Sequence, residues 1–161
     1  MKVTRMTVLA DLIREHGWRR GVELGVWQGE TLAYLLRTFP ALRMIGVDNW
    51  AAVGPYARKN MAAAEQLARV VESRHPHRCY LVKEDTVAGA QYVADGSVDF
   101  VFIDASHDTE SVLGDIVVWE KKLRVGGMLT GHDANWPSVR AALDSAVPGW
   151  KLLDANVWIQ S

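Results

Sequence analysis

Acidic side chains follow each of the first five short apolar stretches of this 161-residue chain. Carboxylates are costly to bury unless they are paired, so several that gather in one place require partners. Polar, hydroxylated or cationic ligands could supply them, and so could a metal ion. Any single one of these acids is explained equally well as the N-cap of a following helix. The set as a whole favours a ligand site, and its members are Glu23, Asp48, Asp85, Asp104 and Asp133.

The first of these acids opens a glycine-rich turn, Glu23-x-Gly25-x-x-x-Gly29. Such strand-to-helix turns let a ligand approach the backbone closely. The third glycine of the dinucleotide-binding G-x-G-x-x-G pattern is absent, and Glu23 would repel a pyrophosphate, so a nicotinamide-dependent oxidoreductase is not favoured. A nucleoside with a positively charged tail fits better. Asp48 stands where such folds place the acid that accepts from ribose hydroxyls.

Alternating apolar stretches and amphipathic segments predict the elements that position these acids. We expect strands at Arg20–Leu24, Arg43–Asp48, Cys79–Asp85, within 97–107 and at 125–133, with two more joined by a turn within 150–160. We expect helices at 4–16, 30–37, 55–75 (with Pro55 as first residue), 86–94, 109–122 and 135–147. In the helix over 109–122 the charge of Asp115 is assigned to the solvated face.

This order of elements predicts an α/β fold: a doubly wound, mostly parallel seven-stranded sheet with helices on both faces and an antiparallel closing strand. The whole chain, 1–161, is expected to be one domain, with an N-terminal helix in 1–17 and a core in 18–161. Ligands of such sheets bind outside the carboxyl ends of the strands, where the strand order reverses. The five acids are therefore expected to converge there.

Composition excludes several other classes. A net charge of −1 provides no global attraction to nucleic acid or an anionic membrane, and leaves only a local basic patch open. The longest apolar runs are too short to cross a bilayer, and Asp11 and Arg14 interrupt the first apolar segment, which argues against a secretory signal. Cys79 is the single cysteine, so no disulfide framework is expected. The expected location is the cytoplasm.

Four motifs in order resemble those of class I S-adenosylmethionine-dependent methyltransferases, which have a Rossmann-like fold. They are the glycine turn, Val47-Asp48, Glu84-Asp85-Thr86 and "VDFVFIDASH", and the resemblance spans about residues 18–160. It implies that the turn lies against the methionine part of the cofactor, that Asp48 binds the ribose hydroxyls, and that Asp85 and Thr86 hold the adenine. The cofactor-binding residues that it implies are Glu23, Gly25, Gly29, Asp48, Asn49, Asp85, Thr86 and Asp104.

The second half of the chain is similar to a subgroup of small-molecule O-methyltransferases that includes enzymes acting on macrolide sugars and, more distantly, catechols. This resemblance implies a hydroxylated small-molecule acceptor and a divalent metal, Mg²⁺, held by Asp104 and Asp133. His107, three residues past Asp104, is the candidate general base, because imidazole has an ordinary pKa near 6.5. Thr109 replaces a tyrosine of the subgroup. The matched positions are Asp104, His107, Glu110, Asp115, Trp119, Gly126, Gly127, His132 and Asp133.

Two other functions stay open at this point. One is methyl transfer to a nucleic acid or a protein; against a nucleic-acid base, "DASH" at 104–107 replaces the Asn/Asp-Pro-Pro-aromatic segment of such enzymes. The other is a non-catalytic module that binds the cofactor. The chain also lacks the long N-terminal extension that covers the substrate in larger relatives, so a homodimer could complete the site.

Overall fold

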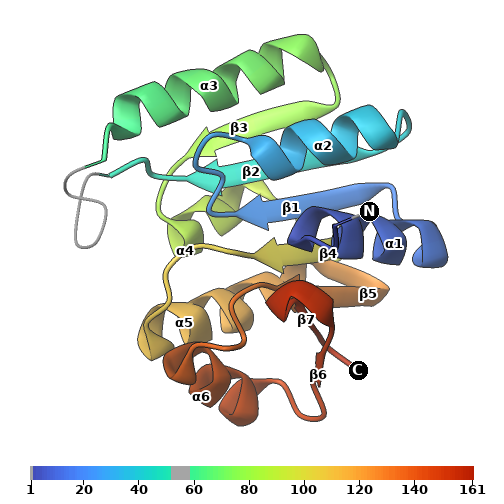
Figure 1. Ribbon diagram of the computed structural model, residues 1–161, viewed down its shortest axis with the longest axis vertical. Coiled ribbons are helices and arrows are strands. Elements are labelled where there is room, and N and C mark those ends of the chain that lie inside the picture. The colour runs from blue at the N-terminus through green and yellow to red at the C-terminus, as the bar shows by residue number, and fades with distance from the viewer. Residues whose placement is uncertain (1, 52–58) are drawn as a thin grey trace.

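The structure, a computed structural model, describes residues 2–51 and 59–161. Seven strands in this part of the chain form one sheet in the order β3-β2-β1-β4-β5-β7-β6 (Figure 1). The strands are β1 (Arg20–Leu24), β2 (Arg43–Asp48), β3 (Cys79–Lys83), β4 (Val98–Ile103), β5 (Leu123–Gly131), β6 (Lys151–Leu152) and β7 (Trp158–Ile159).

The strand pairings confirm the predicted mixed sheet. β1 to β5 run parallel, whereas β7 runs antiparallel to both β5 and β6. The order reverses between β1 and β4, which pair in parallel with Val22 opposite Val101. Every residue of β4 is buried, as expected for a central strand covered on both faces.

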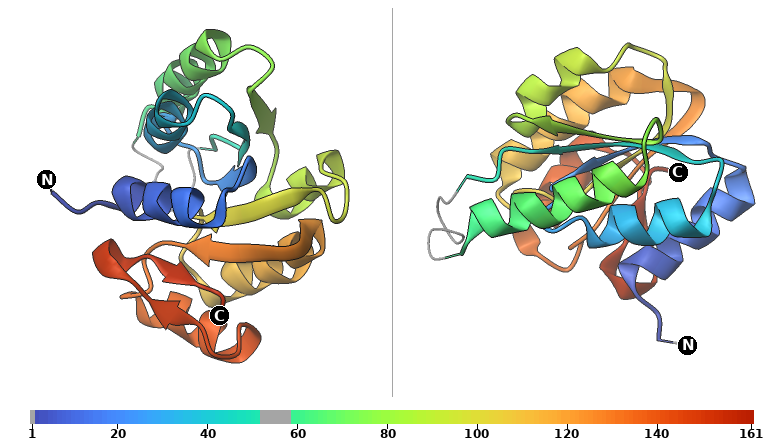
Figure 2. Two further views of the ribbon diagram at one scale, coloured as in Figure 1. Left: turned by 90° about the vertical axis from the view of Figure 1, so that its right-hand side faces the viewer. Right: turned by 90° about the horizontal axis from the view of Figure 1, so that it is seen from above.

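Helices cover both faces of the sheet, as predicted (Figure 2). α1 (Arg5–His16), α2 (Glu30–Thr38) and α3 (Met61–Arg74) pack with Phe100 and Phe102 on one face. α5 (Thr109–Trp119) and α6 (Pro137–Ala146) pack with Val101 and Ile103 on the other, together with the segment after α4 (Thr86–Gly89). None of the described helices has the length and apolarity needed to cross a membrane.

Three expected helices differ in extent. α3 begins at Met61, because the Asn60 side chain accepts from the Ala63 amide at 3.0 Å, and Pro55 lies outside the described residues. The segment over 86–94 is α4 followed by a 3₁₀ turn at Ala90–Tyr92. α5 ends at Trp119, where a second 3₁₀ turn takes over. These tighter turns are common at helix ends.

The assignment of Asp115 to a solvated face was wrong. Asp115 is 1 % exposed, and its Oδ1 has no hydrogen-bond partner among the described residues. Its carboxyl group interacts with the Thr86 side chain, at the start of α4. Burial raises the pKa of Asp115 to about 7. Neutral Asp115 is therefore the form that the fold tolerates.

This burial makes stability depend on pH. Between about pH 4 and pH 7 the folded protein keeps a proton on Asp115 that the unfolded chain has lost, so the free energy of unfolding falls as the pH rises through this window. Asp115→Asn removes that contribution. We therefore expect the free energy of unfolding of this variant to fall with pH by on the order of 3 kcal/mol less than that of the wild type. Urea unfolding at pH 4.5 and pH 8 measures the difference.

The control for this experiment is Asp11→Asn, because Asp11 lies on the exposed face of α1 beside Arg14. Its free energy of unfolding should fall between the two pH values by the same amount as that of the wild type. A decline in Asp115→Asn equal to that of the wild type would show that Asp115 does not titrate as argued.

Candidate functional site

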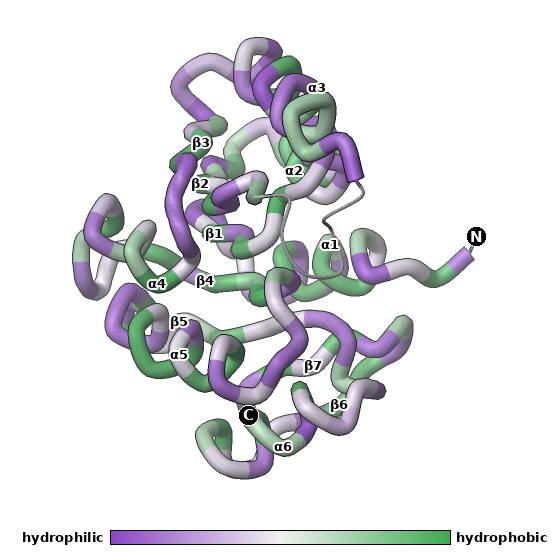
Figure 3. The backbone as a smooth tube through the Cα atoms, turned by 90° about the vertical axis from the view of Figure 1, so that its left-hand side faces the viewer, coloured by the Kyte–Doolittle hydropathy of each residue, from purple (hydrophilic) through white to green (hydrophobic). Residues whose placement is uncertain are grey.

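A cleft of about 330 Å³ lies at the carboxyl ends of the parallel strands. Its volume is within the usual range for small-molecule sites. Figure 3 looks onto this edge of the sheet and shows hydrophilic stretches in the loops beside the hydrophobic end of β4. Of the residues predicted from the sequence, the cleft is lined by Glu23, Gly25, Asp48, Asn49, Asp85, Thr86, Asp104, His107 and Asp133. Gly29 does not line it.

The two glycines of the first turn are both left-handed, with φ of 83° at Gly25 and 78° at Gly29. A Cβ at Gly25 would lie 2.2 Å from the backbone oxygen of Asp104, so this glycine lets the ends of β1 and β4 meet. A Cβ at Gly29 would lie 3.2 Å from the Cα of Ala68 in α3. Gly25 therefore shapes the floor of the cleft, while Gly29 packs α2 against α3.

Asp48 joins two loops at the end of β2. Its Oδ2 accepts from the Trp27 amide at 2.9 Å, and its Oδ1 accepts from the Trp50 amide at 2.7 Å. The Trp50 indole in turn donates to the Trp27 carbonyl at 2.8 Å. Both tryptophans have left-handed backbones, with φ of 49° and 47°, a conformation that bulky residues keep only when their surroundings fix it. Asp48 provides that fixation.

Asp85 is a helix N-cap, the structural alternative that the sequence left open for each acid. Its Oδ1 accepts from the Val87 amide at 3.0 Å. The indole of Trp119 donates to the Thr86 carbonyl at 2.9 Å, so α5 anchors the turn that faces the cleft. The other four predicted acids cap no described helix, although all four line the cleft.

Glu23 is the most deeply buried of these acids, at 2 % exposure. Burial and, secondly, the negative charge of Asp104 raise the pKa of Glu23 well above its usual range. Thr31 in α2 hydrogen-bonds to its side chain, but Oε2 has no hydrogen-bond partner among the described residues. A positively charged ligand group beside Oε2 would stabilise the ionised form.

His132 lies between the two carboxylates at the ends of β4 and β5. Its Nε2 donates to the Ala155 carbonyl at 2.9 Å, so its Nδ1 faces Asp104 and Asp133 at 3.5 Å and 3.1 Å. Burial alone would lower the pKa of His132, but the two carboxylates outweigh it and raise that pKa to about 9. His132 is thus a cation at neutral pH.

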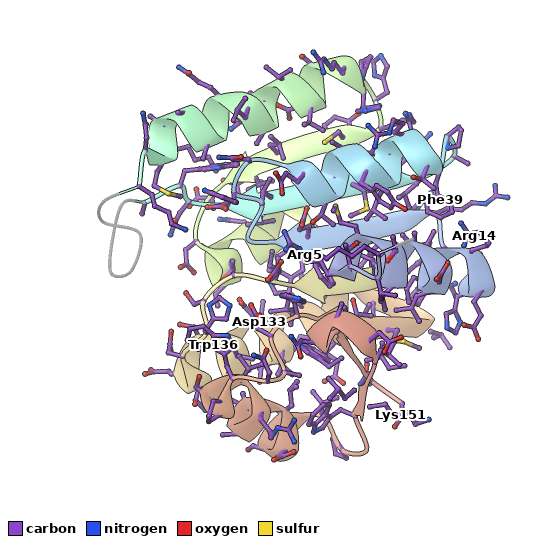
Figure 4. The ribbon with its side chains drawn as sticks, viewed as in Figure 1. Arg5, Arg14, Phe39, Asp133, Trp136 and Lys151 are labelled. Atoms are coloured by element: carbon purple, nitrogen blue, oxygen red, sulfur yellow. The ribbon has the colours of Figure 1, made fainter. Side chains whose placement is uncertain are left out.

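His107 forms a close pair with Asp133. Its Nε2 lies 2.5 Å from Oδ2 of Asp133, and the pair raises the pKa of His107 while it lowers that of Asp133. Trp136 stacks on the imidazole with ring centroids 4.8 Å apart, and the Ser138 hydroxyl donates to the His107 carbonyl. Figure 4 shows Asp133 and Trp136 on the side to which β1 and β4 point. No hydrogen bond of Nδ1 occurs within the described residues.

The donor set fits a divalent metal. Ligand atoms of Asp104, His107 and Asp133 lie within 4.8 Å of one another, and carboxylates with imidazole are common ligands of such ions. The predicted pair of ligands is therefore together, with His107 beside it. All four carboxylate oxygens already have side-chain partners, because Asp104 also pairs with Arg5 at 3.2 Å. A cation at this place would replace some of them.

Sequence reasoning missed several residues that line the cleft. Arg5 comes from α1, which the sequence predicted as a helix with no site residue on it. His132 was singled out only as part of the family pattern, although its position beside Asp133 was a usable signal. Thr31 and Trp27 carried none, because their role depends on tertiary contacts to Glu23 and Asp48.

Comparisons with known proteins agree with this geometry. A family model described as "methyltransferase domain" matches residues 22–134. No curated protein matches the sequence.

Solved structures with similar folds include three that cover nearly the whole chain. A caffeoyl-CoA O-methyltransferase-like protein from Staphylococcus aureus has 14% identity and a TM-score of 0.68, covering 99% of this chain and 84% of that one. Cofactor-bound Rv0187 from MTB has 20% identity and a TM-score of 0.70, covering 99% and 81%. CalS11, a TDP-rhamnose 3′-O-methyltransferase of calicheamicin biosynthesis, has 16% identity and a TM-score of 0.67, covering 95% and 76%. At these identities the likeness concerns the fold.

The close approach at Gly25 predicts a large cost of substitution. Gly25→Ala combines a left-handed alanine with a clash against backbone that cannot move aside, so we expect it to lower the free energy of unfolding by more than about 3 kcal/mol. Gly96→Ala is the matched control, because Gly96 has a φ of 66° and open space around its Cα. It should cost only about 1–2 kcal/mol in urea unfolding. Equal costs would contradict the close contact between the β1 and β4 ends.

Proposed function

This chain belongs to the methyltransferase family whose domain model spans 22–134, and from that premise we propose that it transfers a methyl group from S-adenosylmethionine to a hydroxyl group of a small molecule. The observation that carries the proposal is the single cleft shared by the predicted cofactor residues and the His107–Asp133 pair. The nucleoside site and a candidate base thus face the same space.

Each part of the cofactor has a chemically suitable partner in the cleft. Asp48 offers carboxylate oxygens to the ribose hydroxyls, and Asp85 and Thr86 lie at the turn assigned to adenine. Glu23 offers an unpartnered oxygen to a positively charged group. When bound, S-adenosylmethionine supplies an electrophilic methyl group on a sulfonium.

His107 is the proposed general base. Because a protonated Nε2 donates to Asp133, the basic nitrogen is Nδ1, which can take the proton of the acceptor hydroxyl as its oxygen attacks the methyl carbon. The sulfur–methyl bond would break in the same step, with S-adenosylhomocysteine as the leaving group. Asp133 orients the ring and stabilises the imidazolium that forms, and Trp136 holds one ring face. His107 therefore leaves the step protonated.

Asp104 and Asp133 are the proposed ligands of Mg²⁺, in keeping with the fit of the donor set. The cation would orient an acceptor oxygen and lower the pKa of its hydroxyl. Acceptors with two neighbouring hydroxyls suit such a site. CalS11, one of the similar structures, is named for methyl transfer to a sugar, which supports sugars as the first acceptors to try. Catechols are the second class, because they too carry two neighbouring hydroxyls.

The base assignment predicts a separation of binding from turnover. His107→Gln should keep the affinity for S-adenosylhomocysteine and slow transfer by about 100-fold or more, because a positioned base contributes that much. Asp48→Ala should instead weaken that affinity by roughly tenfold or more, since the ribose acceptor and the anchor of two cleft loops are both lost. Calorimetry measures affinity, and formation of S-adenosylhomocysteine with catechols and sugars measures turnover. Wild-type turnover in His107→Gln would exclude it as the base.

Metal assistance predicts a second, separable effect on thermal unfolding. S-Adenosylhomocysteine at 100 times its Kd should stabilise the fold by about 2.7 kcal/mol, and magnesium should add to this. Asp133→Asn should lose the magnesium response and keep the response to the nucleoside. A chelator-treated sample serves as the reference. An absent magnesium response would leave His107 as a metal-free base, and an absent nucleoside response would contradict the proposed function itself.

A further inference from the structure

Two buried polar atoms of opposite charge face the cleft without hydrogen-bond partners. Among the described residues only three buried side-chain nitrogen or oxygen atoms lack such a partner: Arg5 Nε, Glu23 Oε2 and Asp115 Oδ1. Arg5 and Glu23 both line the cleft, whereas Asp115 lies on α5. Arg5 Nε still lies within ion-pair distance of Asp104, so Glu23 Oε2 is the cleft atom with neither kind of partner. A buried acceptor is costly to leave unpaired, and a guanidinium group that lines the same cleft indicates a ligand that carries both charges.

Both residues are held by elements that pack into the core. Glu23 belongs to β1 and is 2 % exposed. Arg5 is the first residue of α1, whose Leu9, Leu12 and Ile13 are buried against the sheet. Figure 4 labels Arg5 just above Asp133, and Arg5 Nε pairs with Asp104, the residue directly after β4. α1 therefore holds a guanidinium group at the carboxyl ends of the strands.

The Arg5 guanidinium has donors to spare. Its side chain is 32% exposed, and its one ion pair among the described residues joins Nε to Asp104 Oδ2 at 3.2 Å. Guanidinium carries five N–H donors in a planar fork that suits a carboxylate. A ligand carboxylate could therefore bind without displacing Asp104.

We infer that Arg5 and Glu23 bind the amino-acid end of the cofactor, Arg5 its carboxylate and Glu23 its ammonium group. The inference rests on the proposed function and adds a residue of α1 that the cofactor motifs do not contain. A carboxylate entering a cleft lined by several acids would be repelled unless a cation met it. Arg5 removes that repulsion next to the acid that attracts the ammonium group.

Lys59 and His132 are competing cations, because both line the cleft. Both ring nitrogens of His132 are already engaged, Nε2 with the Ala155 carbonyl and Nδ1 with Asp104 and Asp133, which leaves Lys59. The ammonium and carboxylate of an amino acid are attached to one carbon, so their partners must be neighbours. Arg5 pairs with Asp104, and both Arg5 and Asp104 act electrostatically on Glu23. Lys59 lies instead over the ring of Trp27, 4.9 Å from its centroid. Arg5 is therefore the one placed for the carboxylate.

Two nucleosides that differ only at this end provide the test. S-Adenosylhomocysteine carries the ammonium and carboxylate groups, and 5′-methylthioadenosine lacks both. We expect Arg5→Gln to weaken binding of S-adenosylhomocysteine by about 10- to 100-fold and to change binding of 5′-methylthioadenosine by less than about twofold. Calorimetry measures both affinities. Arg5→Lys, which keeps the charge, should retain part of the affinity for S-adenosylhomocysteine.

The matched control is Arg14→Gln on the same helix, because Arg14 pairs with Asp11 at 2.6 Å on the exposed face. It should leave both affinities unchanged, and Lys59→Gln should not reproduce the selective loss. Equal weakening of both nucleosides in Arg5→Gln would show a structural role and overturn the inference, as would unchanged binding of S-adenosylhomocysteine. Failure of the wild type to bind either nucleoside would overturn the proposed function as well.

Discussion

Negative charge gathered at the carboxyl ends of parallel strands is the constraint on which the rest of this site depends. Parallel pairing of β1, β2, β4 and β5 brings Glu23, Asp48, Asp104 and Asp133 to one edge of the sheet. Unpaired carboxylates there would destabilise the fold. Each one is compensated differently: Asp48 by backbone amides, Asp104 and Asp133 by cationic side chains, and Glu23 by a raised pKa.

These compensations connect parts of the chain that are distant in sequence. Asp48 fixes the loops after β1 and β2, and His132 ties β5 to the turn between β6 and β7 through Ala155. Ser138, near the start of α6, donates to the His107 carbonyl and accepts from Thr109 through its own carbonyl. The loops around the cleft are thus held by the same groups that face it, so the site is largely formed before a ligand arrives.

The sequence predicted the strands and the acids, because both follow from short-range pattern. The bounds of β1 and β2 were right to the residue. Of the ten residues assigned to the cofactor, base or metal, nine line the cleft and Gly29 does not. What it could not supply depends on tertiary contacts. Gly29 faces α3, Asp115 turns inward against Thr86, and Arg5 reaches the cleft only because α1 packs beside β4.

The two histidines at this edge have different roles because different ring nitrogens are held. His132 has Nε2 fixed on a backbone carbonyl and Nδ1 facing two carboxylates, so its proton is retained and it serves as a fixed positive charge. His107 has Nε2 fixed on Asp133, while Nδ1 has no partner within the described residues. A nitrogen that must accept and release a proton has to reach the ligand, and only His107 offers one. His132 therefore supplies a fixed charge and His107 the proton transfer. Both histidines contact Asp133, which joins the two roles.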